Sequence, residues 1–377
     1  AGGWGTIPVP SSWRNHRTPI EAGAGPAWED WKPNSRRELR TAWYQKRVVV
    51  PKSWAGRAVI LELDRVSTDA VVFVDGDRVG TVNWPSGAVD LTDAVTPGRT
   101  AEVSILVAAT LTEKTFIQLM GGAPGQNTVR TATLRTKGLI GPVTLKSRPR
   151  GGHIGHVAVN TSVGKLRVGL DLELVDAAGA GRVHVVAEML DEQGHVEKRF
   201  EKAAPIRRES IQRVRVTWDW PDPRLWAVGD PNLYTLQLHV KGAGIDDVYA
   251  TRFGFREFRV EGRGYTLNGV PFKPRTIQAG LPLRELSMQR NLDEMQRLGF
   301  NLMEVWPSDH WNQRGNAGTN ADWFDEADRR GLAITGVMPH VGWAGSRYKN
   351  PEQREAFRQW AEQAWRKYGN HPSLVMW

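Results

Sequence analysis

The stretch LDEMQRLGFNLMEVW, residues 292–306, decides how the C-terminal part of this chain folds. Residues 293–298 have the pattern of a helix, and Gly299 follows them directly. Glycine is common just after a helix, because it adopts the left-handed backbone conformation without strain. The apolar, alternating segment 301–306 begins two residues later, and such alternation is typical of a strand. The stretch therefore predicts a helix that leads into a β-strand.

The same order of helix and strand continues on both sides of this stretch. A second helix is predicted between Asn320 and Gly331, and a third ends at Gly369. The third helix carries an apolar stripe with helical period, which predicts burial of Phe357, Trp360, Ala361, Ala364, Trp365 and Tyr368. Further strands are predicted at 273–277, 332–337 and 374–377. Strands that alternate with helices are parallel, and the helices form the crossovers.

Residues 260–377 are therefore predicted to form the first half of a (β/α)8 TIM barrel. A complete barrel of this kind needs about 250 residues, which is more than this segment supplies. A half-barrel on its own would expose the edge of its fourth strand. We therefore expect the natural protein to continue beyond Trp377.

The N-terminal region, residues 1–148, is predicted to be a β-sandwich of the jelly-roll type. Short β-branched or alternating runs occur at 48–50, 58–63, 70–74 and 103–107. The segment VDGDRVG, residues 74–80, has an Asp-Gly pair between two such runs, which predicts a tight hairpin.

The middle region, residues 149–259, is predicted to be a second, immunoglobulin-like sandwich. Alternation is clear at 165–175, 182–190, 211–218 and 233–240, with turn residues between these runs. About 110 residues with strands at this spacing suit that fold, although the chain has no cysteine for the disulfide of antibody domains. The segment PRGG, residues 149–152, is the expected linker.

Composition narrows the classes of partner. The formal net charge is +9, but no basic run, zinc-finger spacing or helix-turn-helix pattern accompanies it, so nucleic acid is not an expected partner. No apolar stretch is long enough for a membrane-spanning helix. The opening AGGWGTIPVP lacks the pattern of a signal peptide, so we expect any such peptide to be removed or never present. We favour a periplasmic or secreted location over the cytoplasm, and the oligomeric state is left open.

Several segments resemble glycoside hydrolase family 2, the family of β-galactosidases, β-glucuronidases and β-mannosidases. AWYQK at 42–46, VVVP at 48–51 and VFVDGDRVG at 72–80 are similar to the family's sugar-binding jelly roll. LWAVGDPNLYTLQL at 225–238 and RFGFREF at 252–258 resemble the end of its immunoglobulin-like domain. YTLNGVPFKPR at 265–275, RLGFN at 297–301 and YGNHPSLVMW at 368–377 resemble the entry into its barrel and the approaches to strands two and four.

The resemblance implies a retaining exo-glycosidase that uses two glutamates, one as acid/base and one as nucleophile. Such a pair holds one protonated and one ionised carboxyl about 5 Å apart. In the family, the acid/base belongs to an Asn-Glu pair just after strand four and the nucleophile to a later strand. Both positions fall beyond Trp377, so the catalytic pair cannot be assigned to residues of this sequence.

Glu304 is the candidate carboxylate within the sequence. By alternation it shares one face of its strand with Leu302 and Trp306, and we expect that face to point into the barrel, because a carboxylate against the apolar helices would be costly. Its alternative role is structural, paired with an internal arginine such as Arg275. Family members usually carry arginine at this position, so the departure reverses a pocket charge and bears on the substrate preference.

The other substrate-binding candidates follow the predicted strands, because barrel sites are built at the carboxyl ends of strands. Arg275 is expected to end strand one and to orient a catalytic carboxylate or bind a hydroxyl. The loop 307–318 supplies Asp309 and His310, unless it is an ordinary surface insertion. After strand three come two more candidates, an imidazole and an indole. The full set of substrate-binding candidates is Arg275, Trp306, Asp309, His310, His340, Trp343 and Trp377.

The three tryptophans of this set would form an aromatic wall that stacks on a sugar, unless they serve only core packing. His371 is expected to have a structural role, orienting the entry to strand four. His153 and His156 have H-x-x-H spacing but are expected in a solvated loop, so no metal site is predicted. No cofactor is predicted either, because phosphate-cradling glycine motifs are absent from the sequence.

Two functions fit these observations. The first is a hydrolase that removes a terminal sugar from β-linked glycans or glycosides. The second is a non-catalytic or altered-mechanism glycan-binding protein on the same scaffold, which Glu304 at an arginine position motivates. An Asn-Glu pair in the residues after Trp377 would favour the first.

Overall fold

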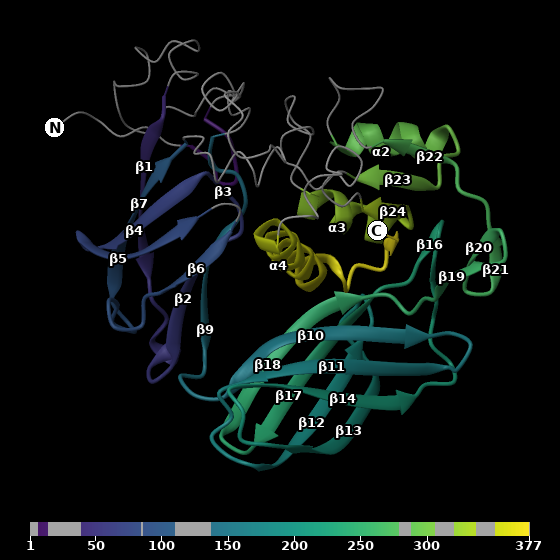
Figure 1. Ribbon diagram of the computed structural model, residues 1–377, viewed down its shortest axis with the longest axis horizontal. Coiled ribbons are helices and arrows are strands. Elements are labelled where there is room, and N and C mark those ends of the chain that lie inside the picture. Colours follow the sequence, from purple (N-terminus) through teal and green to yellow (C-terminus); the bar gives the residue numbers. More distant parts are fainter. Residues whose placement is uncertain are drawn as a thin grey trace. The chain divides into compact units, whose positions relative to one another are not determined.

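The computed structural model describes residues 7–13, 39–83, 86–109, 137–278, 288–305, 320–336 and 351–376 (Figure 1). The chain divides into two compact units, of which the first includes the residues up to Arg148 and the second begins at Pro149. Each unit is described by itself. In the described part of the chain, no helix has the length and apolar character that a membrane crossing requires.

The first unit contains two antiparallel sheets around one apolar core. One sheet has the strand order β1 (Thr41–Val49), β7 (Thr100–Ala108), β4 (Asp69–Val74), β5 (Asp77–Asn83). The other has the order β6 (Gly87–Asp90), β2 (Ala58–Leu63), β9 (Val143–Arg148). The remaining elements are a short helical turn, η3 (Lys52–Trp54), and the paired strands β3 (Val66–Ser67) and β8 (Gly138–Leu139). Valines, leucines and isoleucines at alternate positions of both sheets fill the space between them.

The predicted hairpin at residues 74–80 is confirmed. Strands β4 and β5 pair up to Val74 and Asp77, with Asp75 and Gly76 as the two turn residues. Both have positive φ, 50° and 97°, which the tight turn of an Asp-Gly hairpin requires.

The second unit begins with another antiparallel sandwich, called here the second sandwich. Its sheets have the orders β10 (His153–Ser162), β11 (Arg167–Val175), β14 (Ile211–Asp219), and β13 (Val196–Ile206), β12 (Gly181–Leu190), β17 (Tyr234–Gly242), β18 (Ile245–Phe253). The alternating residues predicted from the sequence point inward and are almost completely buried. Trp220, Tyr234, Phe253 and Phe255 pack as a chain of aromatic rings at one end of this core.

The expectation of a solvated loop at His153 and His156 is wrong. Both residues belong to β10, which pairs with β11 along its length and accommodates Gly155 at a bulge between Ile154 and His156. The Gly-rich sequence suggested a loop because glycine is disfavoured inside strands, but a bulge tolerates it.

The second unit also contains two groups of short strands. Strands β15 (Trp226–Ala227) and β16 (Asp230–Pro231) form one small pair. Strands β19 (Phe258–Glu261), β20 (Gly264–Leu267) and β21 (Val270–Phe272) form an antiparallel meander.

The last part of the chain, called here the β/α segment, has four parallel strands in the order β22, β23, β24, β25. Its elements in chain order are β22 (Thr276–Gln278), α2 (Met288–Arg297), β23 (Leu302–Val305), α3 (Asn320–Arg330), β24 (Ala333–Gly336), α4 (Pro351–Tyr368) and β25 (Leu374–Met376). The alternation of helix and strand predicted from the sequence is thus observed. The expected burial of Trp365 is wrong, since this residue is 47% exposed while Ala364 and Tyr368 of the same helix are buried.

Candidate functional site

Glu304 lies on the face of the parallel sheet opposite the helices. Its neighbours Met303 and Val305 are buried among residues of α2, α3 and α4. Because successive side chains of a strand point to opposite faces, Glu304 and Leu302 point the other way. The prediction that this face of the strand turns away from the helices is confirmed for both residues.

Glu304 belongs to a row of three polar residues in register. Gln278 on β22 is directly opposite Glu304 on β23, which is directly opposite Thr335 on β24. All three side chains are half-buried. Gln278 is the last residue of its strand, and the other two are next to last. The row, called here the polar row, therefore lies near the carboxyl ends of the strands.

Gln278 and Thr335 were missed by sequence reasoning. The sequence predicts the first strand at 273–277, but β22 begins at Thr276 and includes Gln278. Only the register across the sheet shows that these residues are next to Glu304. An amide, a carboxylate and a hydroxyl together offer both donors and acceptors, the combination that binds sugar hydroxyls.

The expectation that Arg275 ends strand one is wrong. Arg275 precedes β22, and its backbone N donates to Asn301 Oδ1 at 2.7 Å while its side-chain Nε donates to Gly299 O. Both partners precede β23, so Arg275 lies at the amino edge of the sheet. Three residues of extended chain, about 10 Å, separate it from the level of the polar row. Arg275 therefore braces the sheet at the edge opposite the expected site and is not the partner of Glu304.

Six predicted site residues lie outside the described residues. They are Trp306, Asp309, His310, His340, Trp343 and Trp377. Their roles stay predictions.

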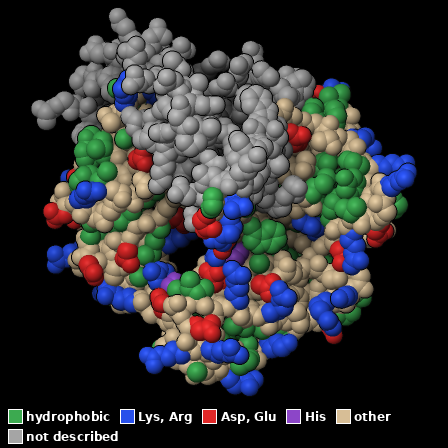
Figure 2. Space-filling view, in the orientation of Figure 1, with side chains coloured by type: hydrophobic (Ala, Val, Ile, Leu, Met, Phe, Trp, Pro, Cys, Tyr) green, Lys and Arg blue, Asp and Glu red, His purple; other side chains and the backbone are tan. Residues whose placement is uncertain are grey.

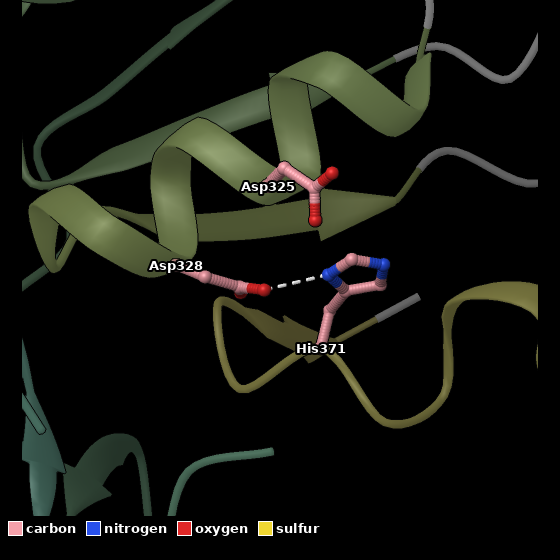
Figure 3. A group of neighbouring side chains, drawn as sticks. All are labelled: Asp325, Asp328 and His371. Carbon is pink, nitrogen blue, oxygen red and sulfur yellow. Dashed lines mark hydrogen bonds and ion pairs between the residues drawn. The ribbon is translucent and has the colours of Figure 1, made fainter. Parts of the chain in front are cut away.

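A second cluster of polar side chains lies at the amino edge of the sheet (Figure 3). Asp325 and Asp328 come from α3, and His371 precedes β25. Asp328 is 1% exposed; its Oδ2 is 2.6 Å from His371 Nδ1, and its Oδ1 accepts the backbone N–H of Ser373 at 3.0 Å. The predicted structural role of His371 agrees with these bonds, which connect the residues before β25 to the end of α3.

The three side chains Asp325, Asp328 and His371 could hold a metal ion by distance alone, since their ligand atoms lie within 4.8 Å of one another. However, the guanidinium of Arg252, from the second sandwich, donates to both carboxylates. It thus supplies positive charge to both carboxylates, of which Asp328 lies in the last turn of α3, where the helix dipole disfavours a negative charge. We therefore interpret the cluster as a structural junction.

The second sandwich forms further hydrogen bonds and an ion pair with the β/α segment. Asn370 donates to Val157 O at 2.8 Å and accepts from Val159 N at 2.9 Å, both on β10. Arg366 on α4 forms a two-pronged ion pair with Glu173 on β11, at 2.8 and 2.6 Å. This guanidinium lowers the pKa of the Glu173 carboxyl below its ordinary value.

Surface charges show no single basic patch in the view of Figure 2. Lysine, arginine and acidic side chains are interspersed over the described surface of this face. Many of them form pairs, such as Arg199 with Glu188 and Glu201.

Comparisons with known proteins show similarity to one family. The sequence model described as "Glycosyl hydrolases family 2" matches residues 152–256, the second sandwich with the residues just after it. The resemblance to glycoside hydrolase family 2 is confirmed. The mostly β-strand fold likewise matches solved structures of family 2.

Relatives of the chain extend this result beyond the matched domain. A β-glucuronidase of Paenibacillus borealis is 26% identical over 369 residues, which cover 91% of this chain and 58% of that protein. A β-galactosidase of Bacteroides ovatus is 24% identical over 355 residues, covering 89% of this chain and 38% of that protein. A solved β-glucuronidase of Bifidobacterium dentium, complexed with coumarin-3-O-glucuronide, has a TM-score of 0.68 at 21% identity, covering 98% of this chain and 61% of that one. The chain thus spans about half the length of the family 2 proteins that it matches.

Proposed function

We propose that the protein containing this chain is a glycoside hydrolase that removes a terminal sugar from β-linked glycans or glycosides. The observation that carries the proposal is the polar row Gln278, Glu304 and Thr335, near the carboxyl ends of parallel strands and on the face away from the helices. Enzymes built on β/α barrels place their sites at these strand ends. The named activities of the family 2 relatives support the same reaction class.

The proposal includes the finer architecture. Residues 1–148 would be a jelly roll, 149–259 an immunoglobulin-like sandwich, and 260–377 the first half of a TIM barrel. The four parallel strands with three helices between them support the last assignment. The remaining strands of the ring would then follow Met376 in a longer protein.

Hydrolysis would proceed with retention through two carboxyl groups about 5 Å apart. The acid/base would follow β25, and the nucleophile would come from a later strand, both beyond this chain. A protonated carboxyl gives its proton to the leaving oxygen while the ionised carboxylate attacks the anomeric carbon. The first carboxyl, then ionised, activates the water that releases the sugar. Trp306, Asp309, His310, His340, Trp343 and Trp377 would contact the substrate.

Glu304 would bind substrate hydroxyls rather than supply one of the two catalytic carboxyls. An ionised carboxylate accepts hydrogen bonds from hydroxyls but repels the carboxylate of a uronic acid, and this repulsion is strong where water is excluded. We therefore propose a sugar without a carboxylate as the preferred substrate, despite the glucuronidase names of several relatives.

The test uses the longer protein and a panel of 4-nitrophenyl β-glycosides that includes galactoside, mannoside and glucuronide. We expect release from at least one neutral glycoside, with the β-anomer formed first as seen by NMR. Glu304→Gln should lower kcat/KM on that substrate by about 10- to 100-fold, the effect of one altered substrate hydrogen bond. The same substitution should raise kcat/KM on the glucuronide relative to kcat/KM on the neutral glycoside. Glu294→Gln is the matched control, because Glu294 pairs with Arg297 on the outer side of α2.

A non-catalytic glycan-binding protein is the second candidate, favoured by Glu304 standing where family members usually carry arginine. It predicts saccharide binding without release of nitrophenol from a folded protein. It also predicts that no Asn-Glu pair follows Trp377 in the longer sequence. Preference for glucuronide by the unaltered protein would contradict the role proposed for Glu304.

A further inference from the structure

The segment just before β25 is held by Arg256, which follows β18, by the backbone of β10 and by Asp328 of α3. Arg256, within RFGFREF, donates from Nε to Pro372 O at 2.9 Å and from Nη2 to Leu374 O. The two carbonyls flank the point at which β25 begins. Asn370, two residues before Pro372, bonds to β10 as described above. Arg256 therefore holds a short backbone segment that lies up to 118 positions later in the sequence.

Strand β25 needs this support, because its own ladder is short and irregular. Leu374 is opposite Ile334 and Met376 is opposite Thr335, so the register shifts by one residue between the two pairs. Val375 has no opposite residue in that ladder. Within the described residues, β25 pairs with β24 alone. A strand of three residues with a bulge and one partner is weakly specified in register and direction.

Arginine is suited to this task for a geometric reason. Its planar guanidinium presents several N–H donors in fixed directions, so that two carbonyls can be held at a set separation. Burial lowers the pKa of Arg256 to about 10, which still leaves it charged near neutral pH. The Asp328 carboxylate, close to the same segment, favours the charged form. Lysine could reach one carbonyl but could not hold both.

We infer that Arg256 is a positioning residue, which fixes the start of β25 and thereby the direction in which the chain leaves this strand at the site edge. The inference rests on the proposed function, in which the acid/base follows β25. Arg256 touches neither substrate nor reacting atoms in this role. It acts from the amino edge of the sheet, through the backbone of one strand. The residues that follow the second sandwich thus serve as part of the framework that orients the acid/base.

The test compares two substrates with the same sugar and different leaving groups in the longer protein. A 2,4-dinitrophenyl glycoside departs without a proton, whereas a methyl glycoside needs a well-placed acid. For Arg256→Met we expect kcat/KM on the methyl glycoside to fall by about 100-fold, the cost of misplacing a catalytic group by about 1 Å. On the dinitrophenyl glycoside we expect less than about a threefold change. Arg256→Lys should also lower kcat/KM more on the methyl glycoside than on the dinitrophenyl glycoside, but by a smaller factor.

Arg366→Met is the matched control. It also removes an arginine that joins the β/α segment to the second sandwich, but its partner is Glu173 and not the backbone of β25. We expect it to leave the ratio between the two substrates unchanged. Equal losses on both substrates in the Arg256 variants, or the same split in Arg366→Met, would overturn the inference.

A second measurement does not depend on activity. Amide exchange followed by mass spectrometry should become faster in residues 370–376 of the Arg256 variants, but not in Arg366→Met. If the unaltered protein hydrolyses neither substrate, the proposed function fails. In that case unchanged exchange in the Arg256 variants would separately refute the claim that Arg256 fixes β25.

Discussion

The second sandwich and the β/α segment bury their residues in different ways. The core of the sandwich is filled by its own two sheets. The β/α segment fills its helix side itself, but the buried residues on the other side, Leu302 and Ala333, pack against Trp226, Leu267 and Phe272 from earlier in the chain. The sandwich is therefore structurally self-sufficient, whereas the β/α segment depends on residues that precede it.

The contacts between these two regions are also different in kind. Inside the sandwich, the packing is apolar and aromatic. Between the sandwich and the β/α segment, several contacts are charged or directed hydrogen bonds, as at Arg252, Arg256 and Asn370. Directed bonds specify position better than apolar packing, which tolerates rearrangement. This junction therefore sets geometry, and the sandwich core supplies stability.

The largest expected effect comes from removing the buried carboxylate of the junction. Asp328→Ala would leave Arg252, His371 and the backbone N–H of Ser373 without a common acceptor. Breaking a buried charged contact by removing one partner costs about 3–5 kcal/mol. We expect faster amide exchange in residues 320–336 and 370–376, with residues 183–189 of the sandwich unchanged.

Asp246→Ala is the matched control for this substitution. Asp246 pairs with His239 and Lys241 on the exposed surface of the sandwich, where ion pairs contribute little. If Asp328→Ala left amide exchange as slow as Asp246→Ala does, Asp328 would not organise the junction.

Two helix-ending glycines test the same comparison on a smaller scale. Gly299 after α2 and Gly331 after α3 have φ of 78° and 61°. A Cβ at Gly299 would meet no atom within 4 Å, whereas one at Gly331 would lie 2.7 Å from Gly229 N and 2.8 Å from Ala227 O. Gly331 thus lies against the β15–β16 turn, which is part of the connection between β14 and β17 of the sandwich.

We expect Gly299→Ala to lower the free energy of unfolding by about 1 kcal/mol, because alanine is strained in the left-handed conformation. Gly331→Ala should cost about 1–3 kcal/mol more, because backbone must move to admit the methyl group. Urea denaturation of both variants measures the difference. Equal costs would show that the close approach at Gly331 relaxes without penalty.

Local patterns in the sequence were sufficient for much of the fold. Period-two alternation located the long strands of the second sandwich, and Gly299 and Gly331 located two helix ends. The inward direction of Glu304 followed from the cost of burying a carboxylate among apolar helices. Each of these features depends on residues that are neighbours in sequence, so each is visible there.

Features that depend on distant residues could not be predicted. The sequence alone puts Arg275 at the wrong edge, because nothing local marks the start of the strand within 273–277, and only pairing with β23 shows that it begins at Thr276. The motifs around Arg256 and His371 were noticed for their resemblance to a family, but nothing local indicates that they meet. The signal that could have linked them is their joint presence, 115 positions apart, in one chain.

The smallest expected effect concerns the ion pair between α4 and the second sandwich as pH falls. His156 on β10 is opposite Glu173 on β11, and Arg366 reaches the same place from α4. Burial first, and the charge of Arg366 second, lower the pKa of His156 below its ordinary value of 6.5. The bond from Arg366 lowers the pKa of Glu173 below 4.5, with a smaller contribution from Arg213. Glu362 bonds Arg366 from within α4.

Because both pKa values are lower in the folded state, the unfolded chain binds more protons as the pH falls. Stability should therefore decrease on acidification, first below about pH 6.5 through His156 and again below about pH 4.5 through Glu173 together with Glu362, whose pKa the same Arg366 lowers. Urea midpoints measured from pH 8 to pH 3 test this order. His156→Gln should remove the first decrease and keep the second, since Gln does not titrate. A first decrease that persists in His156→Gln would show that another group titrates there, and that the junction between α4 and the sandwich does not sense this proton.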